Sequence, residues 1–175
     1  MEDETLIEYG LINLQGHIKP MYFFNQTIVE LIHKHKPEII GWEDLKTNRN
    51  ANTIRTLGRY TGILESICQE LDIEYVQAIP ISVKAAVCKK KGTKTKLDLA
   101  YEICNRYEEI VLDEGKIFKV HERGKDAGQE YIDEEYEVFN ITDAVGIGLY
   151  SLYVRQGVYK PKPKSKKKKK KVIVK

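Results

Sequence analysis

The sequence has few cysteines, no long apolar run and no basic leader. Its three cysteines, Cys68, Cys88 and Cys104, fall on apolar stretches without the spacing of metal ligands, which predicts reduced thiols in a core. No window is apolar over the length of a membrane span. The first residues, MEDETLIEYG, are acidic where a signal peptide is basic. These absences argue against a secreted disulfide scaffold and a membrane protein, so we expect a soluble cytoplasmic chain with no membrane partner.

The last residues of the chain include no aspartate or glutamate. Residues 160–175 read KPKPKSKKKKKKVIVK, with ten lysines and no carboxylate side chain. Removing these ten charges from the formal net charge of +3 leaves residues 1–159 at −7. A lysine run repels itself and buries nothing, so we expect a disordered tail over 158–175. The tail is either solubilising or an arm that binds a polyanion through counterion release, and nucleic acid fits such an arm better than a membrane.

The rest of the sequence alternates between strand-like and helix-like segments. β-branched and apolar residues predict strands at 5–13, 38–42 and 74–79. Apolar residues at helical spacing predict long helices at 21–36, 51–71, 96–107 and 140–155. This order predicts an α/β fold in which helices flank a central sheet.

Shorter features complete the pattern. Ser82 is expected to cap a short helix that ends at Val87. A hairpin is expected over 110–120, turning at Asp113–Gly115. We expect one domain over 1–157, with the hairpin and an acidic connector forming an insertion at 108–138.

Two carboxylates stand where folds of this class collect functional groups. Glu43 follows the apolar strand EIIGW, and functional groups gather at the carboxyl ends of parallel strands. Asp143 is expected in the first turn of the last helix. Each has an ordinary alternative: Glu43 as a solvated strand end, and Asp143 as an acid that complements the helix dipole. If the last helix crosses the sheet near Glu43, the two side chains offer the hard oxygen ligands that Mg²⁺ prefers. Two such ions can clamp the attacking and leaving oxygens in phosphodiester cleavage.

Basic and amide side chains surround these positions in the sequence. A loop rich in lysine, arginine and asparagine follows Glu43, and the loop KKKGTKTK occupies 89–96. We expect both loops to receive a phosphate backbone. The predicted DNA-binding residues are Lys46, Asn48, Arg49, Asn50, Arg55, Lys89, Lys90, Lys91 and Lys94.

Two glycines interrupt the second predicted helix. Gly58 and Gly62 lie four residues apart, and glycine lowers the stability of a helix. The pair therefore indicates the close approach of another backbone. We take this helix as a candidate contact surface.

Several stretches, taken together, resemble a known family. They are WEDLKTNRNANTIRTLGRYTGILESICQELDIEYVQAIPISVKAAV, then GTKTKLDLA, and finally NITDAVGIGLYS. In their order they resemble the RuvC-type crossover junction endodeoxyribonucleases of the RNase H-like superfamily, most closely the divergent phage-type members. The likeness runs from about residue 6 to 107 and resumes at 139–153. It implies an RNase H-like fold with a central mixed sheet flanked by helices.

The resemblance also implies an activity and a site. Members of the family are dimeric, Mg²⁺-dependent nucleases that cut four-way DNA junctions symmetrically, with Mn²⁺ as an alternative ion. Glu43 and Asp143 match the second and fourth acidic positions of the family. Asn140 stands at the third, where it offers a carbonyl oxygen and no charge. Lys84 and Lys96 match the basic residues that serve the scissile phosphate, and the alternative for both is a solvated lysine.

The sequence departs from the family at its start. The first acidic position lies in the family on a strand with a segment like LGIDPG, and neither this strand nor the one after it is present here. We expect a late start in the recorded reading frame, with a split or decayed gene and completion by another chain as alternatives. Two functions follow as hypotheses. One is a metal-dependent endonuclease for branched DNA, and the other is a junction-binding protein without catalysis.

Overall fold

Two parallel strands form the centre of the fold. The computed structural model describes residues 4–45, 50–88, 94–113, 118–121, 123, 126, 128–133 and 137–160. Strand β1 (Ile39–Glu43) pairs with strand β2 (Glu74–Ala78), and Glu43 lies opposite Ala78. Both strands therefore end at the same edge of the sheet. The predictions of strands at 38–42 and 74–79 are confirmed. Among the described residues this sheet has only these two strands, so it is parallel where we expected a mixed sheet.

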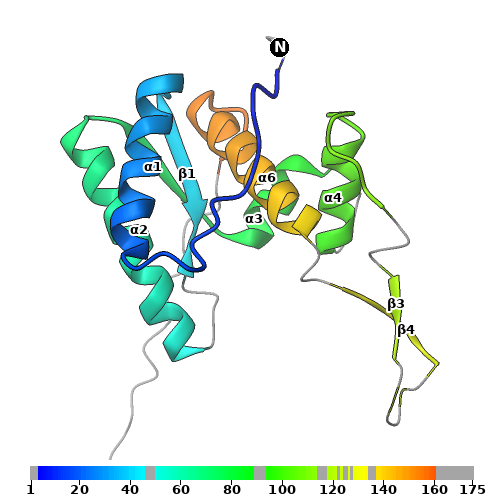
Figure 1. The fold of residues 1–175 in the computed structure, drawn as a ribbon. Coiled ribbons are helices and arrows are strands. Elements are labelled where there is room, and N and C mark those ends of the chain that lie inside the picture. The colour runs from blue at the N-terminus through cyan, green and yellow to red at the C-terminus, as the bar shows by residue number, and fades with distance from the viewer. Residues whose placement is uncertain are drawn as a thin grey trace, which may run out of the picture.

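Helices cover both sides of the sheet (Figure 1). Helices α1 (Pro20–His35) and α2 (Ala51–Glu70) pack against each other on one side, and the ring of Phe24 meets that of Tyr60 edge to face. Helix α6 (Glu137–Arg155) packs on β1 and β2 from the other side. The helices predicted at 21–36 and 51–71 are confirmed. The last helix begins three residues earlier than the predicted 140–155.

The main apolar core lies between α6 and two shorter helices. Helix α3 (Pro80–Val87) and helix α4 (Lys96–Cys104) both pack on α6. Phe139 of α6 and Ile103 of α4 are fully buried there. Helix α4 is shorter than the predicted 96–107, because the chain turns after Cys104. Ser82 is not the cap of α3: Pro80 takes the first helical position, where a fixed φ and a missing N–H carry no penalty.

The predicted first strand is wrong. Residues 4–14 have no strand in the structure. A strand needs a neighbour for its backbone hydrogen bonds, and no described strand pairs with this segment. Side chains hold the segment instead. Glu4 pairs with Arg106, which also donates to the hydroxyl of Tyr153, and the Tyr9 hydroxyl donates to the backbone carbonyl of Glu109.

The hairpin exists with a different register from the predicted one. Strand β3 (Phe118–Val120) pairs antiparallel with β4 (Glu130–Ile132), and the pair projects away from the helices (Figure 1). The predicted hairpin within 110–120 is wrong, because Phe118–Val120 pairs forward in the chain. Gly128, at a φ of 85°, closes the connection by donating its N–H to the carbonyl of His121.

The cysteines agree with the sequence prediction. Cys68 and Cys88 are buried, Cys104 is partly buried, and all three are free thiols. Burial raises the pKa of each thiol above its ordinary value. In the described part of the chain, no helix is both long enough and apolar enough to cross a bilayer.

Candidate active site

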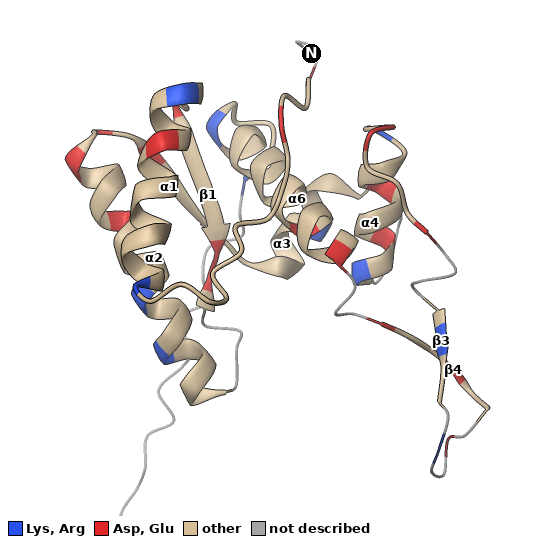
Figure 2. Cartoon of the chain, in the orientation of Figure 1, with Lys and Arg blue, Asp and Glu red and all other residues tan. Residues whose placement is uncertain are grey.

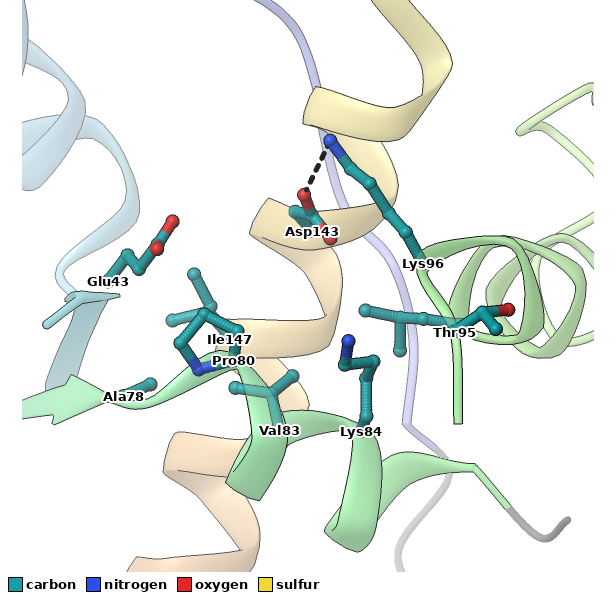
Figure 3. A pocket seen from close by; sticks show the side chains of 10 residues that line it. Glu43, Ala78, Pro80, Val83, Lys84, Thr95, Lys96, Asp143 and Ile147 are labelled. Carbon is teal, nitrogen blue, oxygen red and sulfur yellow. Dashed lines mark ion pairs between the residues drawn. The ribbon is translucent and has the colours of Figure 1, made fainter. Parts of the chain in front are cut away.

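A cavity of about 470 Å³ opens at the edge where both strands end (Figure 3). Glu43 and Asp143 line it from β1 and α6, and Lys84 and Lys96 line it from α3 and α4. Helix α6 therefore crosses the sheet near the end of the Glu43 strand, which is the condition that the sequence hypothesis set. Figure 2 shows acidic residues at the end of β1 and a basic residue at the start of α4, on the same side of the fold.

The alternation of β1 directs Glu43 to this cavity. Trp42 and Asp44 are buried at 7% exposure each, whereas Glu43 between them is exposed. Successive side chains of a strand point to opposite faces, so Glu43 lies on the face that Gly41 presents to α6. The N–H of Asp44 donates to the carbonyl of Ala78 at 2.8 Å, which continues the pairing one step beyond Glu43.

Asp143 lies deeper in its helix than the sequence suggested. Because α6 begins at Glu137, Asp143 stands in the second turn rather than the first. The interaction of an acid with the helix dipole fades beyond the first turn, so this explanation for Asp143 loses its basis. Ile147, one turn later, lines the same cavity, and both side chains share the face of α6 that meets the site.

Lys96 is the first residue of α4 and contacts Asp143. Its Nζ lies 3.2 Å from Oδ2 of Asp143 (Figure 3). The start of α4 is fixed by a capping box: the Thr95 hydroxyl accepts from the N–H of Asp98, and the Asp98 carboxylate accepts from the N–H of Thr95. The Lys96 ammonium also lies 5.3 Å from the ring centroid of Phe139.

The sequence signal for this cap went unused in our predictions. TKLD, residues 95–98, has the Thr-x-x-acid spacing of a capping box. The motif places Lys96 at the helix start, and so at the cavity.

Asn140 stands one turn before Asp143 on α6. It is exposed and does not line the cavity. Among the residues that the structure describes, no three His, Cys, Asp or Glu side chains cluster closely enough to hold a metal ion. Mg²⁺ is commonly held by one or two carboxylates together with waters and substrate phosphates. Glu43 and Asp143 bring two carboxylates of this kind to one cavity, whereas a two-ion clamp requires more acidic ligands than the described residues bring there.

The predicted DNA-binding residues fall into two groups. Three of them are described, and each is in or beside a helix. Asn50 is the N-cap of α2 and accepts from the N–H groups of Asn52 and Thr53. Lys94 donates from Nζ to the carbonyls of Cys88 and Ala85 at the end of α3, and Arg55 is exposed on α2. The others lie outside the described residues: Lys46, Asn48, Arg49, Lys89, Lys90 and Lys91.

Sequence comparison finds relatives over part of the chain. No protein-family model matches the sequence. The crossover junction endodeoxyribonuclease RuvC of Thermomicrobium roseum is 24% identical over 84 residues, which cover 46% of this chain and 52% of that protein. RuvC of Pelotomaculum thermopropionicum is 27% identical over 86 residues, which cover 47% and 52%. The chain thus spans about half the length of these curated relatives.

Structure comparison extends the likeness. Thermus thermophilus RuvC in complex with a Holliday junction substrate has a TM-score of 0.58 and 20% identity, and the match covers 86% of this chain and 78% of that one. A second Thermus thermophilus RuvC structure has a TM-score of 0.56 and 16% identity, with 87% and 79% covered. The chain has the RNase H-like α/β fold of RuvC, and the resemblance drawn from the sequence is confirmed.

Proposed function

We propose that this protein is a metal-dependent endonuclease that cuts the phosphodiester backbone of four-way DNA junctions. One observation carries the proposal. Glu43 and Asp143, from β1 and α6, line a single cavity together with Lys84 and Lys96. The fold shared with RuvC supports the choice of a branched DNA substrate. Such an activity belongs in recombination, repair or phage DNA processing, in a cytoplasmic setting.

The carboxylates bind the ion and the lysines bind the phosphate in this proposal. Glu43 and Asp143 would hold one Mg²⁺, for which Mn²⁺ can substitute, whereas Asn140 lies outside the lining of the cavity and is left without a ligand role. When bound, the ion polarises the phosphate and lowers the pKa of the attacking water. Lys84 and Lys96 stabilise the negative charge that develops on the phosphate oxygens, because they stand at the cavity before the reaction begins.

DNA recognition rests on charge and shape. The two basic loops and the lysine tail supply contacts to the backbone, and contacts of this kind fix position without reading sequence. Backbone contacts of this kind would also suit DNA flaps and other branched structures. In our proposal, selectivity for the four-way junction therefore comes from the spacing of two active sites.

A second copy supplies the other active site. A Cβ built on Gly58 or Gly62 of α2 meets nothing within 4 Å, so no described part of this chain covers these glycines and the close approach predicted there is left to a second copy. Ile54 and Leu57 on the same helix are each 38% exposed. This face of α2 is the dimer surface in our proposal.

The experiment is cleavage of a labelled four-way junction in Mg²⁺, beside a linear duplex of the same sequence. The wild type is expected to cut the junction at paired positions and to leave the duplex intact. Glu43→Gln should bind the junction and fail to cut it. Glu70→Gln, at the exposed far end of α2, is the matched control and should cut like the wild type. Equal cutting by Glu43→Gln and the wild type would overturn the proposal.

One observation favours a second function, junction binding without catalysis. The described residues bring only two carboxylates to the cavity, and Asn140 has no charge. In that case the wild type binds the junction more tightly than the duplex and never cuts it in Mg²⁺ or Mn²⁺. Glu43→Gln would then bind as the wild type does. The same gel measurement therefore separates the two functions.

A further inference from the structure

Lys96 and the proposed metal ion compete for the same carboxylate. The Lys96 ammonium lies 3.2 Å from Oδ2 of Asp143, within ion-pair distance. The two side chains are 28% and 38% exposed, so water screens the pair only in part. An ion that binds Asp143 draws on the same carboxylate charge, and its own positive charge repels the ammonium.

The backbone around Lys96 keeps its side chain at the cavity. The capping box of Thr95 and Asp98 fixes the first turn of α4, and α4 packs against α6. Lys96 therefore approaches Asp143 from a fixed helix start. Only the flexible four-carbon stem of the lysine has to move when the ammonium changes partner.

Phe139 offers the ammonium support that does not depend on Asp143. Its ring is fully buried, and its centroid lies 5.3 Å from the Lys96 Nζ. A cation near an aromatic face gains electrostatic attraction from the ring. Lys96 thus has a resting position beside the cavity even when a metal ion has taken its carboxylate.

We propose that Lys96 is a built-in counter-cation for Asp143, which the metal ion displaces and which then binds the DNA phosphate. This inference rests on the proposed function, because it assumes that Asp143 holds the ion. It predicts that Lys96 weakens metal binding in the free protein. It also predicts that metal and DNA strengthen each other's binding, because a bound phosphate gives the displaced ammonium an anionic partner.

Lys84 provides a matched control. It lines the same cavity from α3, and it forms no ion pair within the described part of the chain. Replacing Lys84 removes one positive charge from the cavity without removing a partner of Asp143. A difference between the two lysine variants therefore reports the ion pair rather than the overall charge.

The test measures Mn²⁺ binding to the DNA-free protein. Binding is monitored by electron paramagnetic resonance, in which the signal of the free ion decreases as Mn²⁺ binds. Lys96→Met should bind Mn²⁺ about tenfold more tightly than the wild type, a factor typical of coupling between sites. Lys84→Met should change the affinity by much less. Lys96→Gln serves as a second variant of intermediate polarity, and circular dichroism checks that each variant is folded. Asp143→Asn should abolish the binding in the wild-type and Lys96→Met backgrounds.

Two failures are distinguishable. If Asp143→Asn abolishes Mn²⁺ binding while Lys96→Met and Lys96→Gln bind no more tightly than the wild type, the counter-cation role is wrong and the metal site stands. If Asp143→Asn leaves Mn²⁺ binding unchanged, the ion is not at this cavity, and the proposed function fails together with the inference.

Discussion

Gly41 on β1 lies so close to Ser151 on α6 that a Cβ added to Gly41 would stand 2.2 Å from the Ser151 Oγ. Ser151 is 1% exposed, and its hydroxyl donates to the carbonyl of Ile147 at 2.8 Å. This approach sets how near α6 lies to the strand. Gly41 and Glu43 share one face of β1, so the same contact places Asp143 across the cavity from Glu43.

Gly41→Ala should therefore lower the free energy of unfolding by about 1–3 kcal/mol, the usual cost of overpacking. Ser151→Ala in the same chain should recover part of the loss, because it removes the nearest atom and leaves the Ile147 methyl at 2.9 Å. Urea denaturation measures both changes. Gly148→Ala is the control on α6: its added Cβ meets nothing within 4 Å, and alanine suits a helix better than glycine by about 1 kcal/mol. A Gly41→Ala protein as stable as the wild type would show that β1 and α6 are not in close contact.

Lys94 is expected to contribute to stability as well as to any binding of DNA. Its ammonium donates to the Cys88 carbonyl at 2.8 Å and to the Ala85 carbonyl at 3.3 Å, at the negative end of the α3 dipole. Lys94→Met should lower the free energy of unfolding by about 1–2 kcal/mol. Lys19→Met, at an exposed helix start with no side-chain cap, should leave it within about 0.5 kcal/mol. If Lys94 served DNA alone, thermal denaturation of the two variants would give the same midpoint.

Glu8 links the segment before α1 to the end of that helix in a pH-dependent way. Its carboxylate accepts from Lys34 at 2.6 Å and contacts the ring of His35 at 2.9 Å. The Lys34 hydrogen bond, with help from His35, holds the pKa of Glu8 below its ordinary value of 4.5. The stabilisation is therefore fully present above pH 4.5 and is lost as the pH falls through the lower pKa of the folded state.

The wild type should accordingly lose more stability than Glu8→Gln when the pH falls from neutral to below this range. Chemical denaturation at a series of pH values measures the difference. Parallel curves for the two proteins would mean that Glu8 has the same pKa in the folded and unfolded states.

The long elements could be predicted from sequence because their signals are local. Helices α1 and α2 have apolar residues at helical spacing over several turns, and β1 and β2 are short apolar runs between turn residues. The segment 5–13 has a similar local signal, yet it forms no strand, because a strand also depends on a neighbour. The hairpin prediction was wrong for a related reason. Phe118 pairs with Ile132, and this pairing depends on residues that are distant in the sequence.

The candidate site divides in the same way. Glu43, Asp143, Lys84 and Lys96 could be named from their order along the chain, but no local pattern says that four elements bring them to one cavity. The Gly41 contact, which makes that meeting possible, involves residues 110 positions apart. The contact of Lys94 with the end of α3 is also beyond sequence reasoning, because a basic loop gives no sign that one of its lysines caps the preceding helix.

The most direct test of the account is the single-turnover rate of junction cleavage in Mg²⁺ by the wild type, Glu43→Gln, Asp143→Asn and the double variant. If the two carboxylates hold one ion, each single change should slow cleavage by about 10²-fold or more, and the double variant should be no slower than the slower single one. A wild type that binds the junction without cutting it, a single variant that cuts at the wild-type rate, or factors that multiply in the double variant would contradict the account.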